Sequence, residues 1–157
     1  MSIAAEAHGV LPLGSRAVGQ ALEVRRIGPI TRADLVRYAG ASGDFNPMHF
    51  DEDYAKSRGL KDVLAHGLFT AGLLAHTLAQ AFDSAQLRRL AVRFAEPVWL
   101  GDSLEISATI TGVAGAGSAK RIELDCLVTA SGGRRVLTGT ATIGDPPPRS
   151  DHGLPQT

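Results

Sequence analysis

The chain has 157 residues, of which 44% are hydrophobic and 20% charged, as in ordinary globular proteins. Sixteen basic side chains balance sixteen acidic ones, so the overall charge gives no reason to expect a nucleic acid or an anionic membrane as partner. The single cysteine, Cys126, excludes an intrachain disulfide and is typical of a cytoplasmic protein.

Residues 1–19 mix small residues without periodicity, and we expect them to form a flexible N-terminal arm. Residues 145–157 begin with three prolines and are expected to form a disordered tail. No internal linker or repeat separates them, so residues 20–144 are predicted to form one domain. We expect no secretory signal, and no apolar run is long enough to span a bilayer.

The first half of this domain reads as one strand followed by short helices. A strand is predicted at Leu22–Ile27. Thr31 and Asp34 then form a capping-box pattern that begins a helix, and the glycines at 40–43 end it. Asp51 is positioned to cap a second, shorter helix.

Residues 66–82 are apolar on nearly every face of a helix, which predicts a central helix that is buried all round. After it, the hydrophobic period changes from 3.6 to 2 around Leu90, in 104–110, in 122–128 and in 136–143. Glycine-rich turns at 115–117 and 131–133 separate three of these strands. The pattern therefore predicts an α+β fold, in which a curved antiparallel meander wraps around one long central α-helix. Because a single sheet leaves an outer face and edges uncovered, we expect a homodimer, with a heterodimer as the alternative.

A polar loop lies between the helices. The run Gly43-Asp44-Phe45-Asn46-Pro47-Met48-His49 contains a proline that prevents one continuous helix, and Ala65-His66-Gly67 follows about twenty residues later. A loop can direct a carboxylate and an imidazole into the same small volume. Taken alone, Asp-x-Asn-Pro is most simply ordinary turn chemistry, whereas with His49 and His66-Gly67 attached a catalytic site is favoured.

These residues, together with Tyr38–Ser42 before them, resemble the signature of MaoC-like (R)-specific enoyl-thioester hydratases and dehydratases. They also resemble the catalytic subunit of mycobacterial-type 3-hydroxyacyl-carrier-protein dehydratases. The resemblance covers about residues 20–144 and implies the hot-dog fold. It implies that Asp44 and His49 hold a catalytic water between them and that the Gly67 N–H donates to the thioester carbonyl. The substrate is then an acyl-CoA or acyl-carrier-protein thioester, and no metal or other cofactor is expected.

Further residues are expected to contact the substrate, and they follow the two motifs or lie on the central helix: Asn46, His66, Leu68, Ala71, Gly72 and Ala75. Small residues on that helix can leave room for an acyl chain. His66 has a second interpretation, as a structural residue that bonds a neighbouring loop. Some family members carry a serine further along the helix, whereas the best-aligned position here is Ala75, with Thr70 and Thr77 nearby.

Other interpretations remain open. A metal site formed by Asp44, His49 and His66 lacks a supporting His-x-x-x-His or cysteine pair. The chain also lacks the Gly-x-Ser-x-Gly elbow of serine hydrolases. Two alternatives to a hydratase are a hot-dog acyl-CoA thioesterase and a non-catalytic acyl-binding partner subunit of a heterodimeric dehydratase. Release of free coenzyme A from a saturated acyl-CoA distinguishes the thioesterase from the hydratase.

Overall fold

A computed structural model describes residues 16–82, 87–115 and 120–144. The tail expected at 145–157 and most of the arm expected at 1–19 therefore lie outside the described residues. Arg16 is buried, and the N–H of Gly19 donates to the carbonyl of Ile110 at 2.8 Å. Within the part of the expected arm that is described, Arg16 is thus buried, whereas residues 17–19 are exposed.

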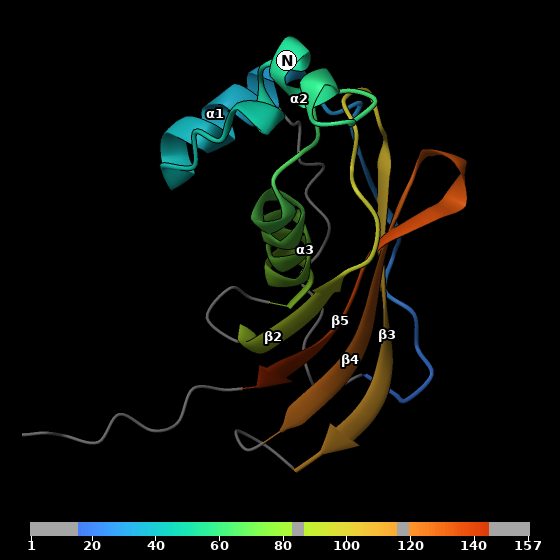
Figure 1. The fold of residues 1–157 in the computed structure, drawn as a ribbon. Coiled ribbons are helices and arrows are strands. Elements are labelled where there is room, and N and C mark those ends of the chain that lie inside the picture. Colours follow the sequence, from blue (N-terminus) through green and yellow to red (C-terminus); the bar gives the residue numbers. More distant parts are fainter. Residues whose placement is uncertain (1–15, 83–86, 116–119, 145–157) are drawn as a thin grey trace, which may run out of the picture.

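The elements follow in the order β1 (Arg25–Ile27), α1 (Arg32–Ser42), η2 (Pro47–His49), α2 (Glu52–Ser57), α3 (Gly67–Phe82), β2 (Leu87–Phe94), β3 (Leu104–Ala114), β4 (Arg121–Ala130), η5 (Ser131–Gly133) and β5 (Arg134–Gly144), where η marks a 3-10 helix. Figure 1 shows α3 lying along one face of the curved sheet, with α1 and α2 together beyond its N-terminal end. None of the helices in the described part of the chain is long and apolar enough to cross a membrane.

The sheet is antiparallel throughout, with strand order β1-β3-β4-β5-β2. The prediction of a simple meander was wrong for β2, which pairs with β5 at one edge rather than with the next strand, β3. Gly139 makes this pairing possible, because a Cβ added there would lie 2.5 Å from the carbonyl oxygen of Ala91. Only glycine allows the two backbones to approach so closely.

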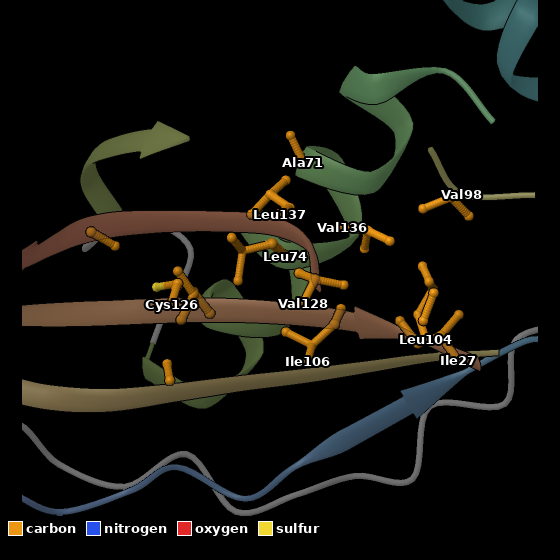
Figure 2. Packing of buried hydrophobic residues seen from close by; sticks show 14 of the residues in the cluster. Ile27, Ala71, Leu74, Val98, Leu104, Ile106, Cys126, Val128, Val136 and Leu137 are labelled. Atoms are coloured by element: carbon orange, nitrogen blue, oxygen red, sulfur yellow. The ribbon is translucent and has the colours of Figure 1, made fainter. Parts of the chain in front are cut away.

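The core lies between α3 and the concave face of the sheet. Figure 2 shows Leu74 of α3 packing toward Leu137 of β5, with Val128 and Ile106 from the neighbouring strands. These side chains are at most 1% exposed. The alternation predicted for β3 and β4 is confirmed, because alternate residues of both strands are buried against the helix.

The prediction that α3 is buried all round was wrong for this single chain. Leu68 is 67% exposed, and Gly72 and His76, each one turn further on, are exposed as well. The physical reason is that one sheet covers one side of a helix. An apolar composition cannot tell whether the chain itself or a second chain covers the other side.

Candidate active site

The first part of the site is a loop held by its own side chains. Gly43 ends α1 in the left-handed conformation, with φ of 74°, and donates its N–H to the carbonyl of Ala39. Asp44 Oδ1 accepts from the Asn46 N–H at 3.2 Å, and Asn46 Oδ1 accepts from the Met48 N–H at 3.2 Å. Two successive turns of this kind fix the backbone, and they leave the second carboxylate oxygen of Asp44 free to face elsewhere.

The second part is the short helix η2. Pro47 occupies its first turn, where a missing N–H costs nothing, and His49 is its last residue. The Nδ1 of His49 lies 2.7 Å from the carbonyl oxygen of Leu64. A carbonyl can only accept, so Nδ1 carries the proton, and the lone pair of the neutral ring is on Nε2.

That lone pair faces Asp44, since His49 Nε2 lies 4.0 Å from Asp44 Oδ2. Both atoms are acceptors when the imidazole is neutral, so they cannot bond to each other directly. A water molecule can donate to both at ordinary hydrogen-bond lengths. The geometry therefore provides a place for one water with its two protons directed at two bases.

The two groups differ in exposure. The side chain of Asp44 is 54% exposed, whereas that of His49 is only 8% exposed. Burial is the main cause that lowers the pKa of His49, and the neighbouring His66 lowers it further. The hydrogen bond to Leu64 and the charge of Asp44 act in the opposite direction. The neutral imidazole is thus favoured, which keeps Nε2 available as an acceptor.

His66 completes the cluster. Its Nε2 lies 3.0 Å from the backbone carbonyl oxygen of Asp44, and its ring stacks on that of His49 with a centroid separation of 3.6 Å. Tyr38 of α1 contacts the His66 ring at 4.9 Å between centroids. The sequence interpretation that His66 bonds a neighbouring loop is consistent with this hydrogen bond.

Gly67 follows directly as the first residue of α3. The first N–H groups of a helix have no carbonyl one turn back, and the helix dipole favours negative charge beside them. A Cβ added to Gly67 would lie 3.2 Å from the ring of Phe94, so this ring closes over the glycine. A cavity of about 270 Å³ begins here and is also lined by Thr70, Val98 and Val136.

The other residues expected to contact substrate are less closely grouped. The amide oxygen of Asn46 caps η2. Ala71 is buried toward the core, where Figure 2 shows it above Leu137. Leu68 and Gly72 are exposed, and Ala75 is half-buried. None of these side chains lines the cavity beside Gly67, and neither do Asp44 and His49, which adjoin it through the 64–67 segment.

A metal ion does not fit the cluster well. Donor atoms of Asp44, His49 and His66 lie within 4.8 Å of one another. However, the two imidazole rings are stacked, with 24° between their planes, so their in-plane lone pairs do not converge on one point. Cys126 is also a poor metal ligand and a poor nucleophile, because burial raises the pKa of its thiol to about 11 and keeps it protonated.

A larger hollow, of about 640 Å³, lies across the middle of the sheet, lined by residues such as Arg93, Asp125 and Thr138. These residues alternate with the core residues of their strands. No histidine is among the described residues that line it, so the Asp44–His49 cluster is the better candidate.

Sequence reasoning missed three contributors to the site. Leu64 acts through its backbone carbonyl, which has no side-chain signal. Tyr38 was part of the quoted motif, but nothing in the spacing indicated a contact with His66. Phe94 ends the strand that the sequence predicts around Leu90, and only the strand order brings that strand beside Gly67.

A long helix against a curved antiparallel sheet, with this loop at the start of the helix, defines a hot-dog protein. Residues 14–131 match the family described as MaoC like domain. The chain belongs to this family, which confirms the resemblance inferred from the motif.

Three known proteins that are similar to this chain are named as hydratases or dehydratases. The chain is 31% identical over 116 residues to an (R)-specific enoyl-CoA hydratase of Rhodospirillum rubrum, covering 73% of this chain and 78% of the relative. It is 30% identical over 119 residues to a 3-hydroxybutyryl-CoA dehydratase of Methylorubrum extorquens, covering 74% of each. The solved R-hydratase PhaJ1 of Pseudomonas aeruginosa superposes with a TM-score of 0.75 at 28% identity, covering 86% of this chain and 85% of that one.

Proposed function

We propose that this chain catalyses the reversible hydration of trans-2-enoyl thioesters to (R)-3-hydroxyacyl thioesters, without a cofactor, in fatty-acid-type metabolism. The observation that carries the proposal is the 4.0 Å separation of Asp44 Oδ2 and His49 Nε2, with the His49 tautomer fixed by Leu64. The relatives described above are hydratases and dehydratases of CoA thioesters, which supports the same reaction class.

In this mechanism one water binds between the two bases. As its oxygen forms a bond to C3 of the enoyl group, its proton passes to Asp44 or His49, and the C2–C3 π electrons move toward the carbonyl. The N–H of Gly67 stabilises the negative charge that develops on the carbonyl oxygen. The proton taken from water is then delivered by the pair to C2, so the elements of one water add across the double bond. Dehydration uses the same steps in reverse.

The neutral imidazole of His49 can either accept the proton of the water or hold the water while Asp44 accepts that proton. With Nδ1–H donating to Leu64, His49 can accept a proton on Nε2, and the charge that results lies near the Asp44 carboxylate. A general base of this kind contributes roughly 10²- to 10⁴-fold in rate. One backbone donor at the carbonyl is worth roughly 3–4 kcal/mol in comparable sites.

We further propose that the protein works as a homodimer in the cytoplasm, with a heterodimer as the alternative. Three large apolar side chains around the site are exposed in the single chain: Phe45 at 62%, Leu68 at 67% and Phe94 at 49%. An exposed apolar group of this kind is typical of an interface. A second copy placed there also covers the open side of the Asp44 carboxylate.

The test of the reaction is an assay of the purified protein with enoyl-CoA substrates of increasing chain length. Loss of the conjugated enoyl thioester is followed by absorbance, and the product is analysed on a chiral phase. The proposal predicts the (R)-3-hydroxyacyl-CoA. Release of free coenzyme A from saturated acyl-CoA, without hydration, would instead establish a thioesterase. Activity that appears only after a second chain is added would establish a partner subunit.

A further inference from the structure

His66 contacts both members of the proposed catalytic pair, through different parts of its side chain. Its Nε2–H donates to the backbone carbonyl of Asp44 at 3.0 Å. Its ring face lies on the ring of His49, with centroids 3.6 Å apart and 24° between the planes. One imidazole therefore sets both the position of the Asp44 backbone and the orientation of the His49 ring.

His66 also directly precedes α3. The backbone carbonyl of His66 accepts from the N–H of Phe69 at 3.1 Å and from that of Thr70 at 3.4 Å. Gly67, the proposed donor to the substrate carbonyl, is the next residue along the chain. His66 thus joins the loop that carries the bases to the helix end that carries the donor.

We propose that His66 is a positioning residue that sets the spacing between the Asp44 carboxylate and the His49 imidazole. This inference rests on the proposed function. The side chain of His66 is buried, with the residue 3% exposed, so it acts through its two neighbours rather than by contact with substrate.

The contacts explain why an imidazole stands here. A phenylalanine ring can stack on His49 equally well, and it leaves no polar atom unpaired. The imidazole instead leaves its buried Nδ1 without a hydrogen-bond partner among the described residues. A buried unpaired acceptor is unfavourable, so the compensating feature is the Nε2–H that bonds to Asp44.

Two substitutions separate the contacts. His66→Phe keeps a flat ring beside His49 and removes the donor to Asp44. His66→Gln keeps an N–H donor of similar reach and removes the ring. Arg26→Gln is the control, because Arg26 lies exposed on β1, at the opposite edge of the sheet from β2.

The kinetic test measures kcat and KM for enoyl-CoA hydration. We expect both His66 variants to lower kcat by on the order of 10- to 100-fold, because small misplacements of reacting groups have effects of this size. KM stays close to the wild-type value, because His66 does not touch substrate. Arg26→Gln keeps wild-type kinetics. A raised KM with unchanged kcat, or wild-type kinetics in both His66 variants, overturns the proposal.

A second readout does not depend on activity. NMR titration follows the His49 ring, which among the described residues faces the titratable groups Asp44 and His66. The burial of His49 and its electrostatic interaction with His66 both lower the pKa of His49. We therefore expect this pKa to rise modestly in His66→Phe and further in His66→Gln, which also uncovers the ring.

An unchanged His49 titration in both variants contradicts the positioning role. If the wild-type protein hydrates no enoyl thioester, the proposed function fails, and the titration still decides whether His66 holds His49. If one variant fails to fold, as judged by circular dichroism, the other decides both readouts.

Discussion

His49 donates its Nδ1–H to the carbonyl of Leu64 at 2.7 Å, from within a buried environment. This single hydrogen bond decides which nitrogen can act as a base. Because Leu64 contributes a backbone group, the arrangement depends on the fold of the 64–67 segment and not on the identity of a side chain.

The burial of His49 predicts a pH dependence of stability. Its folded-state pKa is lowered, so in the unfolded chain the ring takes up a proton near its ordinary pKa of about 6.5 while the folded ring stays neutral. The free energy of unfolding is unaffected by this group above that pH, and it decreases as the pH falls below it. Urea unfolding of wild type and His49→Gln at several pH values measures the difference. We expect the free energy of unfolding of the wild type, relative to that of the variant, to decrease as the pH falls. A difference in unfolding free energy that is independent of pH would contradict the lowered pKa.

A methyl group at Gly67 should reduce activity without unfolding the protein. In Gly67→Ala the added Cβ lies 3.2 Å from the exposed Phe94 ring, which can move, and it stands next to the N–H that we propose contacts the substrate. We expect kcat/KM to fall by at least about tenfold, which is less than the roughly 10²- to 10³-fold for complete loss of such a donor because the N–H itself remains, with an unchanged circular dichroism spectrum.

The control for this variant is Gly40→Ala on α1, where an added Cβ meets nothing within 4 Å. It should stabilise the helix by about 0.5–1 kcal/mol and leave the kinetics unchanged. Equal activity in both variants would remove Gly67 from the mechanism.

The wall of the cavity beside Gly67 depends on a buried ion pair. Arg134 donates to Asp102 through Nη2 and to the carbonyl of Pro97 through Nη1, the latter at 2.8 Å. Asp102 also accepts from the N–H of Trp99 at 2.8 Å. We expect Asp102→Asn to cost on the order of 2–3 kcal/mol in urea unfolding, somewhat less than for a fully buried pair because the Arg134 side chain is 27% exposed.

An exposed ion pair provides the comparison. Arg26 and Glu105 lie 2.7 Å apart on the surface, and Glu105→Gln should cost less than about 1 kcal/mol. Similar losses of unfolding free energy in the two variants would mean that the Asp102–Arg134 pair does not stabilise the cavity wall.

A substitution at Leu68 tests the proposed dimer interface. We expect wild type to have the mass of a dimer in light scattering after gel filtration, and Leu68→Asp to shift it toward the monomer, because a charge is placed in an apolar interface. The control is Val24→Asp, next to β1 at the opposite edge of the sheet from β2. A monomeric wild type, or a Leu68→Asp variant that stays dimeric, would contradict the proposed interface.

Local signals predicted local structure well. The Thr31–Asp34 capping box, the Asp51 cap and the alternation in β3 and β4 were confirmed, because each depends on residues within a few positions of one another. The family was predicted from one loop, because Asp-x-Asn-Pro-x-His followed by His-Gly is a specific combination.

Relationships over long sequence distances were not predicted. The pairing of β2 with β5 depends on the close approach at Gly139, and the exposed side of α3 depends on what the chain leaves uncovered. The tautomer of His49 depends on a carbonyl fifteen residues away. Hydrophobic periodicity contains none of this information.

The most direct test of the central claim is crotonyl-CoA hydration by Asp44→Asn. The variant keeps the size of the side chain and the acceptor for the Asn46 N–H, and it removes one of the two bases that face the water. We predict a folded protein whose kcat falls by at least about 100-fold, the lower end for loss of a general base. A folded variant that hydrates crotonyl-CoA at close to the wild-type rate would contradict the account.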